Sequence, residues 1–201
     1  MKSPYEVEIK LKVSNPAALK RRLAALGFRV VRRYFESNHL FDFPDQKLRR
    51  ARTLLRLRFA GNANLLTFKG SPLRSRDYKI RAEYETDVQD GKALWQVLEG
   101  LGLREAFRYE KYRTVYGRKL PDRKPAGQAR ESAELVYDET PIGNYLELEG
   151  PKGWIDALAA KLGYQRGDYV TASYVRLYYQ SCAERGKKPV NMLFRDHGKR
   201  R

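Results

Sequence analysis

The feature that most constrains the fold is a set of short segments in which long charged side chains alternate with apolar ones. In YEVEIKLKV, residues 5–13, Glu6, Glu8 and Lys10 fall on one face of an extended chain, because successive side chains of a strand point to opposite sides. The same alternation returns in LLRLRF (54–59), LLTFKG (65–70), YKIRAEYET (78–86), EKYRTVY (110–116), LVYDE (135–139) and NYLELEG (144–150). This period of two predicts a strand in each segment.

Taken alone, each strand is typical of an antiparallel sheet that turns one polar face to water. Together the strands favour a different arrangement, because their polar positions carry Glu, Lys and Arg in pairs two residues apart. If the sheet closes on itself, the apolar residues face outward toward helices and the charges line a tunnel. We therefore predict an α+β fold built on a closed antiparallel β-barrel. A lining of desolvated charges requires a charged, hydrated ligand.

Four helices are predicted outside this barrel. Segments 15–28, 90–103 and 153–164 repeat apolar residues at helical spacing and reach Gly27, Gly102 and Gly163, which suit the left-handed residue that follows many helices. A fourth segment, 171–186, mixes β-branched and aromatic residues, and we predict a helix there as well.

Length and composition favour one domain. The chain has 201 residues, and we expect a single tunnel domain over residues 1–183 followed by a basic, flexible tail over 184–201. Segment 121–132 has the composition of a long mobile loop that could cover a site. Because the sequence has no apolar run that could span a membrane and no signal-peptide core, we expect no membrane partner and a cytoplasmic location. A single cysteine, Cys182, excludes an internal disulfide and a thiolate zinc site.

The formal net charge of +17 indicates an anionic partner. Like charges are also gathered: Glu6 and Glu8 would lie about 7 Å apart on one strand face, and their repulsion at an effective dielectric of about 20 is on the order of 2 kcal/mol. Glu147 and Glu149 repeat this arrangement. Such carboxylates suit a hard divalent cation, Mg²⁺ or Mn²⁺, whereas the arginines and lysines of other strands suit several phosphate groups.

Taken in order, these segments resemble the CYTH domain, a family of triphosphate tunnel metalloenzymes. The resemblance is carried by the ExExK strand of Glu6, Glu8 and Lys10 and by LRLR, LTFKG, RAEYE, YEKYRTVY, DETPIGNYLELEG and SYVRLY, from about residue 5 to 180. The family includes class IV adenylyl cyclases, thiamine triphosphatases and inorganic triphosphatases. The resemblance implies an eight-stranded antiparallel barrel whose tunnel binds a triphosphate together with a divalent metal.

The resemblance also assigns roles to individual residues. The residues that match metal-binding acids are Glu6, Glu8, Asp138, Glu147 and Glu149. Those that match phosphate-binding positions are Lys10, Arg56, Arg58, Lys69, Arg81, Lys111 and Arg113. The predicted catalytic residues are Glu8, Lys10 and Asp138, and the further tunnel acids, which could instead pair with nearby cations, are Glu83 and Glu85.

Two features lie outside this pattern. The turn before LLRLR, where the family usually has a small residue such as glycine, holds Ala51 among Arg49, Arg50 and Arg52. This charge could aid anion capture at a tunnel mouth, or it could be plain surface. His39 could serve as a general base, but a lone histidine is more often structural.

Three functions are compatible with these observations. The main hypothesis is a divalent-metal-dependent hydrolase of a triphosphate compound: inorganic tripolyphosphate, thiamine triphosphate or a nucleoside triphosphate. The alternative is a class IV adenylyl cyclase that converts ATP to cyclic AMP and pyrophosphate, although the sequence shows no convincing adenine pocket. A non-catalytic module that binds polyphosphate or nucleic acid is disfavoured, because paired inward carboxylates would repel phosphates without metal. Nucleic acid is therefore not the expected partner, while a homodimer is compatible with exposed helix faces.

Overall fold

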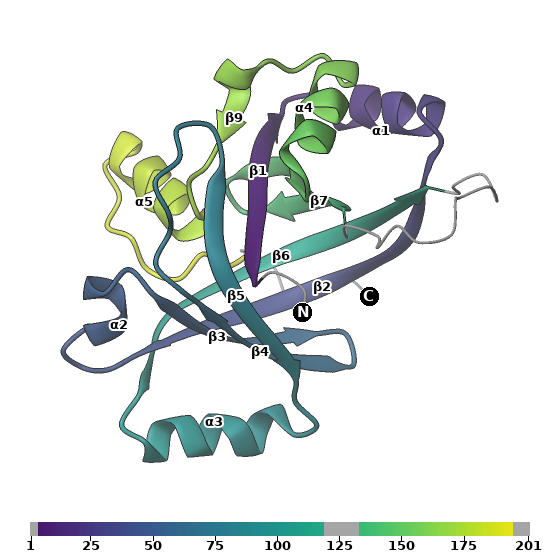
Figure 1. Ribbon diagram of the computed structural model, residues 1–201. Coiled ribbons are helices and arrows are strands. Elements are labelled where there is room, and N and C mark those ends of the chain that lie inside the picture. The colour runs from purple at the N-terminus through teal and green to yellow at the C-terminus, as the bar shows by residue number, and fades with distance from the viewer. Residues whose placement is uncertain (1–3, 119–132, 195–201) are drawn as a thin grey trace.

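The structure is a computed structural model that describes residues 4–118 and 133–194. Its centre is an antiparallel sheet that curls back on itself (Figure 1). The strands are β1 (Tyr5–Val13), β2 (Phe28–Asp42), β3 (Leu54–Ala60), β4 (Ala63–Lys69), β5 (Lys79–Asp87), β6 (Arg104–Arg118), β7 (Glu134–Thr140), β8 (Gly143–Glu149) and β9 (Tyr169–Val170).

The sheet closes because β1 pairs on both of its edges. Among the described residues the strand order is β5-β4-β3-β2-β6-β7-β8-β1-β9, and β1 also pairs with β5, with Glu8 opposite Lys79 and Glu6 opposite Arg81. Strands β1 to β8 thus form a closed eight-stranded antiparallel barrel, and β9 adds only a short pairing beside Lys10. The predicted fold is confirmed.

Helices pack on the outside of this barrel (Figure 1). They are α1 (Pro16–Ala25), α2 (Lys47–Arg50), α3 (Gly91–Gly100), α4 (Lys152–Lys161), α5 (Tyr174–Glu184) and the short 3₁₀ helix η1 (Arg166–Asp168). The outward residues Ile9 and Leu11 of β1 are fully buried against α1 and α4, and Leu57 of β3 is buried in a cluster with α3. Burial of these alternate apolar positions holds the sheet closed with its charged positions inside.

The predicted helices are confirmed, and their ends have identifiable causes. The Asn15 side chain accepts a hydrogen bond from the backbone N–H of Ala18 at 3.0 Å and so caps α1. Gly27, Gly102 and Gly163 follow α1, α3 and α4 with φ of 85°, 90° and 83°. This left-handed conformation costs glycine less than any other residue.

Strand β2 was not predicted from the sequence. Its first half, residues 28–35, pairs with β6 but not with β3, and most of it is exposed. Because neither face of this half is buried, its apolar and polar side chains do not alternate, and the sequence therefore gives no sign of a strand there.

The segment after α5 also differs from expectation. Within residues 187–194, Met192 is fully buried and pairs with Tyr109 of β6, and the backbone N–H of Phe194 donates to Glu110. This stretch covers the part of the β6 edge that lies beyond its pairing with β7. The prediction of a flexible tail therefore does not hold for residues 187–194, while residues 195–201 and the loop predicted over 121–132 lie outside the described residues.

In the part of the chain that the structure describes, no helix is both long enough and apolar enough to cross a membrane.

Candidate active site

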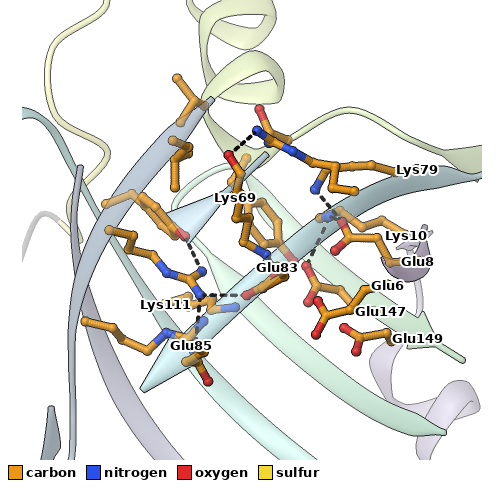
Figure 2. A pocket seen from close by; sticks show the side chains of 18 of the residues that line it. Glu6, Glu8, Lys10, Lys69, Lys79, Glu83, Glu85, Lys111, Glu147 and Glu149 are labelled. Carbon is orange, nitrogen blue, oxygen red and sulfur yellow. Dashed lines mark hydrogen bonds and ion pairs between the residues drawn. The ribbon is translucent and has the colours of Figure 1, made fainter. Parts of the chain in front are cut away.

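The barrel encloses a cavity of about 160 Å³ that is lined mainly by charged side chains (Figure 2). The charged lining residues are Glu6, Glu8, Lys10, Arg56, Arg58, Lys69, Lys79, Arg81, Glu83, Glu85, Lys111, Arg113, Glu134, Glu147 and Glu149. The structure thus brings every predicted site residue except Asp138 onto the wall of one cavity. Their roles stay predictions.

The charges are sorted along the cavity. Strand β1 runs from Glu6 through Glu8 to Lys10, while the antiparallel β5 begins with Lys79 and Arg81 and only later reaches its acids. In the observed register the cations of both strands therefore lie toward the same end of the barrel. At that end Ser173, Tyr174 and Val175, at the start of α5, also line the cavity.

Lys10 lies at the centre of a chain of ion pairs. Its Nζ is 2.8 Å from Glu8 Oε1 and 3.2 Å from Glu147 Oε1, and Lys79 Nζ is 2.7 Å from the same oxygen of Glu8. Burial alone would raise the pKa values of both glutamates, but the positive charge of Lys10 and its neighbours holds them well below their usual range. Both carboxylates are therefore ionised and already paired.

Glu6 and Glu149 form no ion pair with any described residue. Burial, a hydrogen bond with Glu83 and the charge of Glu149 raise the pKa of Glu6 to about 9. Burial and the charges of Glu8 and Glu134 raise the pKa of Glu149 to about 7. With no described protein cation paired to them, both acids keep their protons to higher pH than an ordinary glutamate does, and a cation from solution could take the place of those protons.

Acidic side chains hold the cations of the β3–β5 wall in place. Arg56 is buried and donates hydrogen bonds to Thr67 Oγ1 at 3.0 Å and Glu85 Oε2 at 3.3 Å. Lys69 forms an ion pair with Glu83. Glu83 and Glu85 thus pair with nearby cations, which is one of the two arrangements their sequence positions allowed, and both also line the cavity.

Asp138 is fully buried and lies behind the cavity wall. Its Oδ2 accepts hydrogen bonds from Lys111 at 2.8 Å, Arg113 at 2.7 Å and Tyr174 at 2.9 Å, and its Oδ1 accepts a second bond from Arg113 at 2.8 Å. With both oxygens occupied, the carboxylate is arranged to fix two cations, Lys111 and Arg113, that line the cavity. This arrangement differs from the direct metal contact that the resemblance implied.

Three charged residues, Glu36, Lys79 and Glu134, were not among the predicted site residues, and of these Lys79 and Glu134 line the cavity. Glu36 is fully buried 3.4 Å from Lys111; burial alone would raise its pKa, but Lys111 and Arg113 lower it below the usual range. Its position on β2 could not be placed because that strand was not predicted. Lys79 was visible on the charged face of its strand, but it matches no position of the resemblance; its place on the cavity wall and its contact with Glu8 assign it to the site.

His39 lies on the outer face of the barrel. Its Nδ1 is 2.6 Å from Glu105 Oε1 and its Nε2 is 2.8 Å from Ser37 Oγ, and its ring meets Phe59 and Trp95 edge to face. Because it does not line the cavity, a role as the general base there is wrong, and the structural interpretation fits.

The described carboxylates do not form a complete site for a divalent metal by themselves. Among the described residues, no three Asp, Glu, His or Cys side chains are gathered closely enough to hold a metal ion. Mg²⁺, however, is usually bound by one or two carboxylates together with substrate phosphates and water. Glu6 and Glu149, with Glu8 and Glu147 beside them (Figure 2), fit this mode because the same cavity is also lined by lysine and arginine side chains that suit phosphate groups.

Comparisons with known proteins agree with this geometry. The CYTH domain family model matches residues 4–174. A Methanocaldococcus jannaschii protein named "Putative adenylate cyclase" is 28% identical over 145 residues, which cover 72% of this chain and 75% of that protein.

Solved structures share the fold at low identity. A Vibrio parahaemolyticus protein described as a "putative adenylate cyclase" is 19% identical with a TM-score of 0.72, and the match covers 88% of this chain and 98% of that one. HpAC1 from Hippeastrum, a "putative adenylyl cyclase" described as having a dominant triphosphatase activity, is 21% identical with a TM-score of 0.60 and coverages of 92% and 97%. At these identities the likeness shows the fold.

Proposed function

The chain belongs to the CYTH domain family, and on this premise we propose that it is an enzyme that hydrolyses a triphosphate compound in the barrel cavity with Mg²⁺ or Mn²⁺. The observation that carries the proposal is the convergence of inward cations from five strands on one cavity. These cations are Lys10, Arg56, Arg58, Lys69, Lys79, Arg81, Lys111 and Arg113. Several phosphates in a row are the ligand that such a lining fits, because guanidinium groups bind phosphate oxygens in pairs and lysine adds point charge.

The acids would hold the metal. Glu6 and Glu149 are the first candidates because no described protein cation is paired with them and their raised pKa values leave protons that a metal can displace, and Glu8 and Glu147 line the same cavity. When bound, a divalent cation neutralises phosphate charge and favours attack by water on phosphorus. Carboxylates that are partly protonated without metal would release protons as it binds.

The cations of the wall would bind and orient the phosphates. Lys111 and Arg113 are held by Asp138 at fixed positions, so they can stabilise charge that develops on the phosphate without reorganising. Burial would lower the pKa of Lys10, but Glu147 and Glu8 raise it above its usual range. Lys10 therefore acts as a permanent positive charge and not as a base.

The proposal is tested by phosphorus NMR of the purified protein with tripolyphosphate, ATP and thiamine triphosphate, each with Mg²⁺ or Mn²⁺ and with an EDTA control. Orthophosphate together with a diphosphate product is the expected result. Glu8→Gln should lower turnover about a hundredfold or more, whereas Glu105→Gln on the outer face should leave it unchanged. Full metal-dependent activity in Glu8→Gln would contradict the assignment.

A class IV adenylyl cyclase is the second candidate, favoured by the names of the Methanocaldococcus and Vibrio relatives. The same phosphate site would then serve attack by the ribose 3′-hydroxyl on the α-phosphorus of ATP. Cyclic AMP and pyrophosphate in the ATP sample would establish this reaction in place of hydrolysis. Retained binding with no turnover of any substrate would instead leave a non-catalytic polyphosphate-binding module.

A further inference from the structure

A second cationic feature lies outside the cavity. An open groove between the turn before β3 and the loop that joins β4 to β5 is lined by Arg52, Pro72, Leu73, Arg74, Ser75 and Arg76. We call it the outer arginine groove. It includes Arg52 of the turn in which Ala51 is flanked by Arg49, Arg50 and Arg52.

The outer arginine groove is attached to the cavity wall. Arg81, which lines the cavity, donates hydrogen bonds to the carbonyl oxygens of Arg52 at 2.9 Å and Gly70 at 2.6 Å. Ser71 Oγ donates to the carbonyl oxygen of Ala51 at 2.6 Å and joins the loop to the turn. Figure 1 shows this loop, α2 and α5 at the same end of the barrel, which is the end where the cations of β1 and β5 lie. The positive lining therefore continues from the cavity to the surface.

The charges of the groove are largely uncompensated. Within the described ranges, the guanidinium groups of Arg52 and Arg74 form no ion pair, and Arg76 is 97% exposed with only Asp77 nearby, at 3.9 Å. Arg52 has a φ of 58°, a conformation that non-glycine residues rarely adopt. Burial lowers the pKa of Arg81, and the charge of Arg52 lowers it further. A strained turn with unpaired like charges is a common property of binding sites, where a ligand supplies the missing interaction.

We infer that the outer arginine groove binds the phosphates of a linear inorganic polyphosphate that extend beyond the part held in the cavity. This inference rests on the proposed function and names a substrate class for it. The residues that line the groove include no aromatic side chain, so bases of a nucleic acid would have nothing to stack on, whereas an inorganic chain needs only charge.

The reaction on such a chain is the same hydrolysis. The oxygen of water forms a bond to the terminal phosphorus as the bond from that phosphorus to the bridging oxygen breaks. The bridging oxygen keeps the electron pair and becomes the new end of the chain, and the proton lost by the attacking water passes to solvent. The products are orthophosphate and a polyphosphate shorter by one phosphate. Contacts along the outer arginine groove would act on binding, and so on KM, because they lie away from the bond that breaks.

The test compares tripolyphosphate with a size-fractionated, medium-length polyphosphate. The groove variant carries Arg52→Gly, Arg74→Ser and Arg76→Ser; glycine suits the φ of position 52, so the turn should be preserved. The control variant removes the same charge at exposed positions elsewhere, with Arg21→Ser, Lys161→Ser and Arg185→Ser. Both substrates are assayed for kcat and KM with Mg²⁺, and binding of each is measured by calorimetry.

The wild-type protein and the control variant should bind the longer chain more tightly than tripolyphosphate. The groove variant should raise KM and Kd for the longer chain about tenfold, with kcat and all constants for tripolyphosphate within about twofold. An unchanged Kd for the longer chain in the groove variant would overturn the inference. Tighter binding of a 5′-triphosphorylated RNA than of polyphosphate, lost in the groove variant, would overturn it in favour of nucleic acid. Absence of turnover in the wild-type protein would overturn the proposed function instead, and the binding data would still decide the role of the groove.

Discussion

At the scale of single residues, the cavity contains carboxylates in two electrostatic states. Glu8 and Glu147 share Lys10 and remain ionised. Glu6 and Glu149 retain protons at a pH where a solvated glutamate would have lost them. Desolvation is the first cause in all four cases, so the difference arises from the nearest charge, which is a lysine for one pair and another carboxylate for the other. Because ionisation of Glu6 and Glu149 is unfavourable in the folded state, these two residues lower the stability of the metal-free protein.

Glu149→Gln should therefore stabilise the metal-free protein at neutral pH and above. The pKa of Glu149 is about 7 in the folded state, against an ordinary value of 4.5, so between these values the folded state holds more protons than the unfolded state and wild-type stability falls as pH rises. Glutamine does not titrate, and the advantage of the variant should grow from near zero at pH 4.5 to on the order of 3 kcal/mol above pH 7. Urea unfolding with EDTA at several pH values measures it, with the exposed Glu99→Gln as the control. A difference that does not vary with pH would contradict this explanation.

Asp138→Asn tests the buried carboxylate that holds Lys111 and Arg113 at the cavity wall. The substitution leaves Lys111, Arg113 and the Tyr174 hydroxyl around a neutral amide. Removal of one partner from a buried ion pair costs about 3–5 kcal/mol, so the midpoint of urea unfolding should fall sharply.

Asp156→Asn is the matched control for that experiment. Like Asp138, Asp156 accepts hydrogen bonds from three side chains, but it lies at the partly exposed surface. Its donors are Tyr78, Tyr169 and Arg166. An exposed pair contributes only about 0–1 kcal/mol. Equal losses in the two variants would show that burial of the Asp138 cluster does not determine its contribution.

At the scale of elements, the sequence could predict those strands and helices of which one face is buried. β1 alternates because Ile9 and Leu11 are covered while Glu8 and Lys10 face the cavity, and that pattern is visible in one dimension. The exposed half of β2 shows no such pattern. Because β2 was not predicted, Glu36 in its other half was not predicted as a site residue either. Elements whose residues are held by partners distant in the chain cannot be recognised from local periodicity.

The segment after α5 illustrates this limit and gives a prediction. Met192 is fully buried beside Tyr109, whereas Val190, two residues earlier, is 69% exposed. Met192→Ala should lower the free energy of unfolding by about 2–5 kcal/mol, and Val190→Ala should change it by less than about 0.5 kcal/mol. Thermal and urea unfolding of both variants measure the difference. A small effect of Met192→Ala would mean that residues 187–194 contribute little to the stability of the barrel.

At the scale of the whole molecule, the site exists only because the barrel closes. Glu8 lies opposite Lys79 on one side and opposite Glu149 on the other, so residues from the start, middle and end of the chain meet on one wall. The sequence could predict which residues face inward, and most of the predicted site residues do line the cavity. It could not predict which acids pair with cations, because those contacts depend on the register between strands far apart in the chain.

Closure also gathers cations whose mutual repulsion a bound polyanion would relieve, and this gives the last prediction. Tripolyphosphate with Mg²⁺, at about a hundred times its Kd, should add about 2.7 kcal/mol to the stability of the folded state. For a chain of this size that corresponds to a rise in Tm of about 5–10 °C. Differential scanning calorimetry measures the rise in Tm. The controls are orthophosphate with Mg²⁺ at matched ionic strength, and tripolyphosphate with EDTA in place of Mg²⁺. Orthophosphate spans fewer of the cations, and without metal the carboxylates repel the ligand, so both controls should give smaller shifts. Equal shifts in all three samples would mean that the protein responds to general screening of its +17 net charge and not to occupation of the cavity.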